Sequence, residues 1–203
     1  MQILVDSGTT LVLLTPSSTK IYKQVGQLSS GQFMDVTVRD GAFFAYLPQY
    51  LTLYSDAVFS QKQRIHLTST SSLIWLDWIT SGRLSRAEKW MFKYFASEIK
   101  IFIDDVLQIA DPWRLQDSPV SSLANRVGPY LSYANMFIIG PKTLQMRDAM
   151  LLVEPCLTVV STFSVIGDGM VIRIAGYTTE SVHSFALKIL SFGQFSWRDL
   201  FQV

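Results

Sequence analysis

A turn followed by a short apolar run recurs along the first half of this 203-residue sequence, and this spacing constrains the fold most. The turns lie near positions 8, 41, 71 and 105, so they are about 30 to 34 residues apart. The apolar runs that follow are 11–14, 43–47, 73–76 and 106–107. One turn and one strand per repeat is typical of stacked β layers or a β-solenoid. An ordinary β-meander would give a similar pattern and stays open as the alternative.

Two turn motifs predict β-hairpins. Asp40-Gly41 lies between apolar runs, and Asp-Gly in that setting is a common hairpin turn. The Gly-Asp-Gly motif at 167–169 joins the apolar runs 157–166 and 170–175, which gives the clearest hairpin in the sequence. These strands make the predicted fold mainly β.

Helical signals are few. Residues 143–152 predict one helix, and Thr178 can cap another because its side-chain oxygen can accept from the first turn. Apolar residues at helical spacing follow this cap: Val182, Phe185, Ala186 and Ile189. Residues 111–122 contain two prolines and many polar residues, which predict a loop. We therefore expect a single domain over residues 1–203, a β-helix-like scaffold of stacked β layers with about two short helices.

Composition narrows the class of protein. Hydrophobic residues make up 49% of the chain and charged residues 16%, so the chain buries a large core or additional surface against partners. A net charge of +1 gives no indication of nucleic-acid binding. No apolar run approaches the roughly 18 residues of a membrane-spanning helix, and the single cysteine, Cys156, fits a reducing compartment. We expect a cytoplasmic protein that contacts neither membrane nor nucleic acid.

The stretch 72–90 combines large apolar groups with charges. Asp77 lies between two tryptophans, and a half-buried carboxylate needs a partner. Arg83 and Arg86 are the nearest candidates. The stretch is either a structural strand, turn and ion pair, or a functional surface at a strand end.

Residues 76–94 read LDWITSGRLSRAEKWMFKY. As far as Phe92 and without a gap, this run resembles the approximate signature LDW-x-TSGR-x-x-RGE-x-W-x-F-x-x-Y of the urease accessory protein UreD family, called UreH in some bacteria. The one departure is Ala87, where the family has glycine, and alanine would be strained if the backbone there needed a positive φ. The residues after 84 have helical propensity, but the resemblance favours a strand from about Lys89 onward.

Resemblance to the UreD family implies a maturation factor and not an enzyme. It implies binding to the urease apoprotein and to UreF-like and UreG-like accessory proteins, of which UreG hydrolyses GTP and supplies nickel. The chain would bridge that complex to urease and act as a nickel conduit. Nickel would then be transient, with no tightly bound cofactor, because carboxylates, hydroxyls and water release a hard cation more readily than thiolates do. Family members carry further strands before this point, so we expect the N-terminal part of the family domain to be missing.

The candidate partner-binding or conduit residues lie in segments that resemble the family. They are Ser18, Thr19, Lys20, Asp56, Gln61, Asp77, Thr80, Ser81, Arg83, Arg86 and Glu88. We expect Asp77 and Arg83 to have a structural role, enclosed by Gly82 and the tryptophans. Arg86 and Glu88 should lie nearer solvent and face a partner. The sequence does not identify which residues touch nickel.

Catalytic motifs are not found. The sequence contains no phosphate-binding loop, no H-E-x-x-H, no G-x-S-x-G and no paired cysteines. The sequence has only two histidines, His66 and His183, and this small number disfavours a Ser-His-Asp triad and a tight metal site. The alternative function is a β-rich carbohydrate-binding protein or hydrolase, in which the five tryptophans would be sugar platforms. Glycan binding without urease association would favour that alternative.

Overall fold

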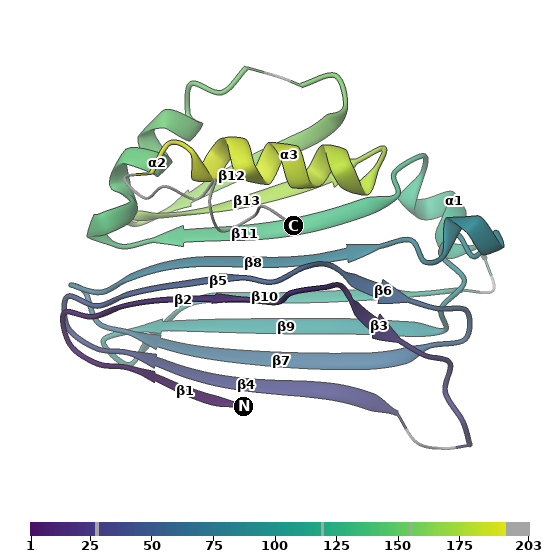
Figure 1. The fold of residues 1–203 in the computed structure, drawn as a ribbon, viewed down its shortest axis with the longest axis horizontal. Coiled ribbons are helices and arrows are strands. Elements are labelled where there is room, and N and C mark those ends of the chain that lie inside the picture. Colours follow the sequence, from purple (N-terminus) through teal and green to yellow (C-terminus); the bar gives the residue numbers. More distant parts are fainter. Residues whose placement is uncertain (27–28, 119, 155, 194–203) are drawn as a thin grey trace.

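The computed structural model describes residues 1–26, 29–118, 120–154 and 156–193, and it is mainly strands, at 51%. Two sheets face each other (Figure 1). The first, sheet A, has five strands in the order β1-β4-β7-β9-β10. Their bounds are β1 Gln2–Val5, β4 Ser30–Val38, β7 Val58–Leu67, β9 Tyr94–Ile103 and β10 Val106–Gln116.

The second sheet, sheet B, has eight strands. Six follow the order β12-β13-β11-β8-β5-β2, while β3 pairs with β6 and β6 with β8. Their bounds are β2 Thr10–Leu14, β3 Thr19–Ile21, β5 Phe43–Leu47, β6 Leu51–Leu53, β8 Ser72–Thr80, β11 Ser132–Ile139, β12 Val159–Ile166 and β13 Gly169–Gly176.

The first part of the chain coils as a β-solenoid, as the turn spacing predicts. Thr10 lies opposite Phe43, and Phe43 lies opposite Ser72, so successive parallel strands of sheet B are offset by 33 and 29 residues. Sheet A shows the same offsets between β1, β4 and β7. Each coil crosses from sheet A to sheet B, and the coils stack through parallel ladders. The prediction of stacked β layers is confirmed.

Antiparallel strands follow the parallel coils. β9 and β10 form a hairpin in sheet A, and β11 pairs with both β8 and β13 in sheet B. The hairpin predicted around residues 167–169 is present as β12 and β13. The hairpin predicted at Asp40-Gly41 was wrong, because β4 and β5 belong to different sheets and the turn is a corner between them.

Two boundary predictions are corrected by the structure. The loop expected over residues 111–122 is strand as far as Gln116. Pro112 is tolerated because β10 is an edge strand, where a missing N–H need not break the ladder. The strand expected from Lys89 begins at Tyr94. Ala87 and Trp90 have positive φ, which is incompatible with an extended strand.

The described residues form three α-helices, where about two were expected. They are α1 Leu123–Val127, α2 Leu144–Met150 and α3 Thr179–Leu190, accompanied by the short 3₁₀ helices η1 Leu84–Arg86 and η2 Pro141–Thr143. Thr178 caps α3 as predicted: it accepts from the Ser181 N–H at 3.0 Å, and the Ser181 hydroxyl accepts from the Thr178 N–H. The predicted apolar face of α3 is buried.

The core lies in two places. The outer face of sheet B packs against α2 and α3, around residues such as Leu76, Ile172 and Phe185. Between the sheets lie two further apolar clusters at the two ends of the strands. One contains Trp75 and Ile101, and the other contains Trp90 and Phe95. Both sheets are therefore held by apolar burial on their inner faces.

No helix among the described residues is long and apolar enough to cross a membrane. Of the aromatic residues near the C-terminus, Phe195, Trp197 and Phe201 lie outside the described residues, whereas Phe192 packs against the apolar cluster on the outer face of sheet B.

The glycine that ends β11 makes a testable prediction. Gly140 has φ +91°, and a Cβ there would lie 2.1 Å from the Ser71 carbonyl oxygen. Gly140→Ala should cost roughly 3 kcal/mol or more of unfolding free energy, from backbone strain plus overpacking. Gly41→Ala is the control, because φ is +63° with no atom within 4 Å of the added Cβ, and it should cost only about 1 kcal/mol. Urea unfolding measures both, and equal losses would contradict the prediction.

Candidate functional site

A polar layer crosses the interior between the two sheets. On each of the strands β7 to β11, the inward-facing positions run from one apolar cluster to the other, and one or two polar residues interrupt them. On β8 the inward sequence is Trp75, Asp77 and Ile79, with the flanking residues in different clusters. The inner polar layer consists of Gln61 and Gln63 from β7, Asp77 from β8, Ser97 from β9, Asp111 from β10, Asn135 from β11 and Arg173 from β13.

Asp77 is the centre of this layer. Only 7% of the residue is exposed. The Gln61 amide nitrogen donates to both carboxylate oxygens at 2.8 Å, and the Ser97 hydroxyl donates to Oδ2 at 2.8 Å. The amide of Gln61 also donates to Ser97 Oγ at 2.9 Å. The carboxylate is thus held by neutral donors, and no ion pair to it occurs among the described residues.

Burial raises the pKa of Asp77 above its ordinary value. Hydrogen bonds from Ser97 and Gln61 act in the opposite direction, and the negative charge of Asp111 raises the pKa further. The pKa of Asp111 is also raised by burial, although the guanidinium of Arg173 lowers it. A carboxyl group whose charged form is disfavoured either stays protonated or attracts a cation.

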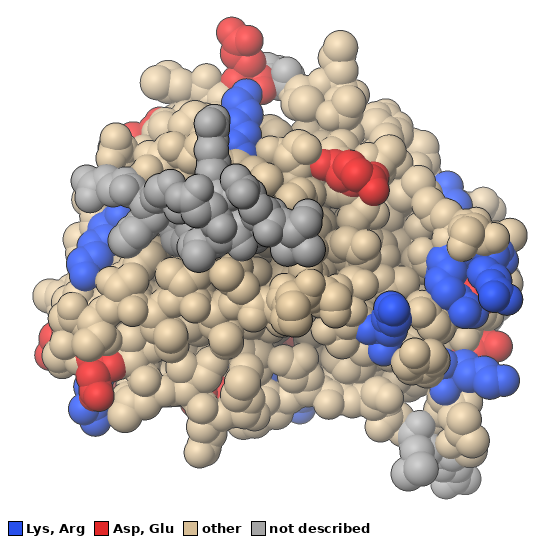
Figure 2. All heavy atoms as spheres, in the orientation of Figure 1, with Lys and Arg blue, Asp and Glu red and all other residues tan. Residues whose placement is uncertain are grey.

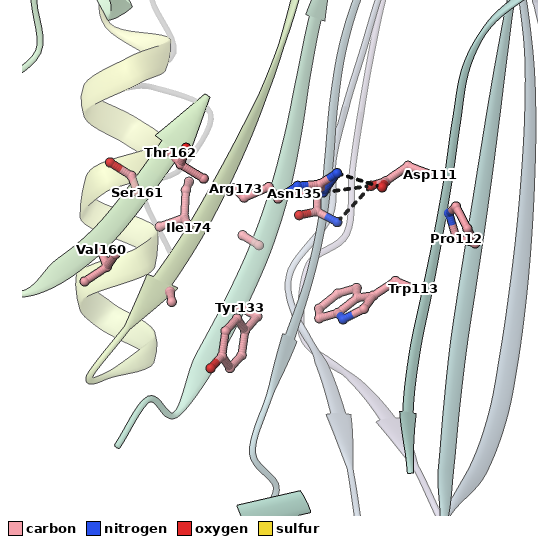
Figure 3. Close-up of a pocket in the computed structure, with 12 residues that line it drawn as sticks. Asp111, Pro112, Trp113, Tyr133, Asn135, Val160, Ser161, Thr162, Arg173 and Ile174 are labelled. Carbon is pink, nitrogen blue, oxygen red and sulfur yellow. Dashed lines mark hydrogen bonds and ion pairs between the residues drawn. The ribbon is translucent and has the colours of Figure 1, made fainter. Parts of the chain in front are cut away.

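The layer reaches a pocket at the open side of the sheets. Arg173 donates to Asp111 at 2.8 and 3.3 Å, and the Asn135 amide donates to the same carboxylate at 3.4 Å (Figure 3). These three side chains line a pocket of about 390 Å³ together with Trp113 and Tyr133. Arg173 is half exposed, whereas the Asp111 side chain is 15% exposed. The pair therefore lies where solvent meets the interior.

Some buried polar atoms have no hydrogen-bond partner within the described part of the chain: Gln63 Oε1, Trp75 Nε1 and Ser81 Oγ. Gln63 is 5% exposed, and its side chain acts to lower the pKa of Asp77. An unpaired buried oxygen is costly, and such atoms usually bind water or an ion. No group of three or more His, Cys, Asp or Glu residues within the described ranges is placed to hold a metal ion.

A second charged group lies at the strand ends, in the loop 82–93. Arg83 forms two hydrogen bonds with Glu88, of which Nε to Oε2 is 2.9 Å. Glu88 Oε2 also accepts from the Ser55 N–H at 3.3 Å. The Arg83 guanidinium lies 4.0 Å from the ring centre of Tyr54. The hydrogen bonds with Glu88 raise the pKa of Arg83 and lower the pKa of Glu88.

The predicted pairing of Asp77 with Arg83 or Arg86 was wrong. Asp77 points between the sheets, whereas Arg83 follows Gly82, where the chain turns out of β8 and binds Glu88. Glu88, which we expected nearer solvent, has a side chain only 13% exposed because it accepts from Arg83 and Ser55. Arg86 is exposed, as expected for a partner-facing residue.

The other predicted residues lie in four places. Gln61 joins Asp77 in the polar layer. Thr80 and Ser81 are buried at the end of β8, where Thr80 contacts Thr52. Asp56 lies in an exposed turn beside the 82–93 loop. The remaining three, Ser18, Thr19 and Lys20, lie at or beside the start of β3.

Sequence reasoning missed most of the polar layer. Gln63, Ser97, Asp111 and Asn135 were not identified as candidates. Their signal is a polar residue at an inward position of an alternating strand, such as Phe95-x-Ser97-x-Ile99. Alternation alone gives the inward face of a strand, but it does not give which strand lies opposite.

The tryptophans do not form exposed platforms in the described part of the chain. Trp75, Trp78 and Trp90 are buried, with Trp90 donating to the Tyr130 carbonyl at 3.0 Å. Trp113 is half-buried beside the pocket. Trp75, Trp78 and Trp90 each belong to an apolar cluster. Little of their ring surface is therefore left for a sugar.

The coiled, stacked sheets define a β-solenoid-like protein with a polar layer between two apolar clusters. A family model described as UreD urease accessory protein matches residues 1–200. The chain belongs to the UreD urease accessory protein family, which places it in urease maturation.

Three curated relatives give the extent of the similarity. Urease accessory protein D of Oryza sativa subsp. indica is 32% identical over 211 residues, which cover 89% of this chain and 69% of the rice protein. The protein of the same name in Arabidopsis thaliana is 29% identical, covering 89% and 72%. Urease accessory protein UreD of Anaeromyxobacter sp. (strain Fw109-5) is 31% identical, covering 95% and 66%.

The backbone conformation of Ala87 leads to a prediction about stability. Its φ of 57° and ψ of 25° lie in the left-handed region. Alanine is therefore strained at the position where the family signature has glycine. Ala87→Gly should raise the unfolding free energy by about 0.5 to 1 kcal/mol, because relief of left-handed strain exceeds the added flexibility of the unfolded chain. Ala110→Gly, at an exposed position inside β10, should instead lower it by a similar amount. Chemical denaturation measures the free energy of unfolding of both variants, and a loss of stability in both would contradict the prediction.

The raised pKa of Asp77 predicts how the stability of the fold depends on pH. Because its pKa is raised on folding, the native chain keeps a proton that the unfolded chain has lost, so stability falls as pH rises from the unfolded pKa through the folded pKa. Asp77→Asn should remove that fall and stabilise the protein at pH 8 by about 1–3 kcal/mol, because it removes a buried charge that only neutral donors compensate.

Denaturation at several pH values between 4 and 8 measures the effect, with Asp168→Asn as the control. The Asp168 side chain is 89% exposed, so its replacement should leave the pH dependence unchanged. A destabilised Asp77→Asn protein at pH 8 would show that the charged carboxylate is stabilised within the layer.

Proposed function

We propose that the protein is a non-catalytic maturation factor that binds the urease apoprotein together with UreF-like and UreG-like accessory proteins. Membership of the UreD family over residues 1–200 carries the proposal. Three relatives that are named as urease accessory proteins support it. In this role the solenoid is a scaffold, and urease itself remains the enzyme.

The inner polar layer supports a nickel route through the scaffold. Asp111 and Asn135 meet the pocket, and Asp77 lies deeper between the sheets, coupled to Asp111 by charge. A second pocket, of about 660 Å³, borders Gln61 and Ser97, but most of its lining comes from outward-facing residues of sheet A such as Lys62 and Glu98. Carboxylates, amides and hydroxyls suit a hydrated divalent cation in passage, whereas a tight nickel site needs softer nitrogen or sulfur ligands. Nickel is therefore cargo here, held weakly and released.

The cost of the polar layer in folding stability also supports a role in passing a cation. A solenoid interior is most stable when its inward positions are apolar, since a buried carboxylate without a cation is costly. Seven polar side chains at aligned inward positions are difficult to explain as packing alone. A role in passing a cation gives the layer a function that offsets its cost in stability.

The experiment compares urease maturation by wild-type protein and two matched variants. Purified or co-expressed protein is combined with urease apoprotein, the UreF-like and UreG-like proteins of the same organism, and nickel. Urease activity and the nickel content of urease are both measured. Asp77→Asn should co-purify with urease as the wild type does but reduce nickel content several-fold, because a neutral amide attracts a cation less. Asp168→Asn should mature urease normally.

Two results would count against the proposal, in different ways. Wild-type protein that neither co-purifies with urease nor raises its activity would remove the maturation role. Full nickel loading with folded Asp77→Asn would remove the route through the polar layer while the maturation role stands.

A further inference from the structure

The net charge of +1 conceals an uneven distribution of charge. Figure 2 shows lysine and arginine side chains gathered at the end of the molecule where β3, β6 and α1 lie. The described cations in the segments that meet there are Lys20, Lys23, Arg83, Arg86, Lys89, Lys93 and Arg126, against the acids Asp56, Glu88 and Asp117. At the opposite strand ends the turns carry Asp6, Asp40, Asp104, Asp105 and Asp168. One end is thus basic and the other is rich in aspartate.

Large apolar side chains are exposed at the basic end. Tyr22 is 66% exposed, Leu84 52% and Met91 53%. Aromatic residues, methionine and arginine are enriched in protein–protein interfaces, where an apolar centre is surrounded by charge. The combination differs from an ordinary solvated surface, in which lysine and glutamate dominate.

These residues form one continuous surface. The Tyr22 and Tyr54 rings meet edge to face at 5.1 Å, and Arg83 lies over Tyr54. The Asp56 N–H donates to the Met91 carbonyl at 3.0 Å. We call the six residues that carry this surface the docking face: Tyr22, Lys23, Arg83, Leu84, Arg86 and Met91.

The loop behind the docking face is held in one conformation. Three of the non-glycine residues with positive φ occur here, namely Asp56, Ala87 and Trp90, and such residues cluster at functional sites. The buried Trp90 fixes the loop, because its N–H donates to the Ser81 carbonyl at 2.6 Å and its ring donates to Tyr130. A rigid surface loses less entropy on binding than a mobile one.

The cations of the docking face differ in how they are used. Arg83 is neutralised by Glu88 and oriented on Tyr54. Within the described part of the chain, neither Arg86 nor Lys23 forms an ion pair, and both are exposed. Charge complementarity therefore requires a negatively charged partner opposite Arg86 and Lys23.

We propose that the docking face binds an acidic surface of a protein partner, with Tyr22, Leu84 and Met91 as apolar contacts and Arg86 and Lys23 as ion-pair donors. This deepens the proposed function, on which it rests, by naming the face and the chemistry that a partner must present. A protein fits better than a nucleic acid, because a phosphate backbone offers no apolar surface to cover the exposed side chains of Tyr22, Leu84 and Met91. Exposed apolar side chains also gain from a protein surface that covers them.

The experiment measures binding of full-length variants to each partner separately. The probes are the urease apoprotein, the UreF-like protein and the UreG-like protein of the same organism, with a DNA duplex as the nucleic-acid probe. Lys23→Glu/Arg86→Glu is the docking variant. Lys62→Glu/Arg64→Glu, on the exposed outer face of β7, makes the same charge change elsewhere. Thermal melting of each variant establishes that it is folded.

The docking variant should weaken binding to at least one protein partner by about tenfold or more, and flatten the salt dependence of its affinity. Tyr22→Ala should weaken binding to the same partner without changing the salt dependence of the affinity, because it removes an apolar contact and no charge. The control variant should bind within about twofold of wild type, since exposed charges far from an interface contribute little.

Other results overturn the inference in ways that can be told apart. If the docking variant binds every partner and matures urease as the wild type does, the docking face is wrong while the proposed function stands. Equal losses from the control variant would show a general charge effect, and loss of DNA binding alone would show a nucleic-acid surface. Wild-type protein that binds no partner would overturn the inference and the proposed function together.

Discussion

Parallel ladders with offsets of 29 and 33 residues set the positions of side chains inside this protein. Each ladder keeps neighbouring strands in register, so the inward residues of one strand lie beside those of the next. Apolar residues then form continuous clusters at the two ends, and polar residues form a layer between them. A shift of one residue in any strand would turn its inward side chains outward and break the layer. The interior chemistry therefore depends on register before it depends on any single contact.

The polar layer is stabilised locally although its charge is costly. Gln61 and Ser97 satisfy the Asp77 carboxylate, and Arg173 satisfies Asp111 nearer solvent. Apolar clusters on both sides supply the burial that offsets the cost of the layer. This arrangement explains why one strand can contain two buried tryptophans and a carboxylate and still be a core strand.

β8 connects the inner polar layer to the docking face. Its inward residue Asp77 belongs to the polar layer, and Gly82 begins the loop that presents Arg83 and Arg86. A Cβ at position 82 would lie 2.2 Å from the Glu88 carbonyl oxygen, so the loop closes directly over this glycine. The signature segment thus combines an interior and a surface role, and Trp90 joins them by anchoring the loop to the apolar cluster below.

The sequence by itself determined the mainly β class, the turn spacing, the cap of α3 and the strain at Ala87, because each depends on neighbouring residues. The family followed from a contiguous signature for the same reason. The tertiary structure alone decided that Asp77 meets Gln61 and Ser97 in place of Arg83, and that residues 111–116 form an edge strand. Asp77 and Ser97 are 20 positions apart and lie on different sheets. Their contact requires the register of several ladders and the packing of both sheets, which no local pattern contains.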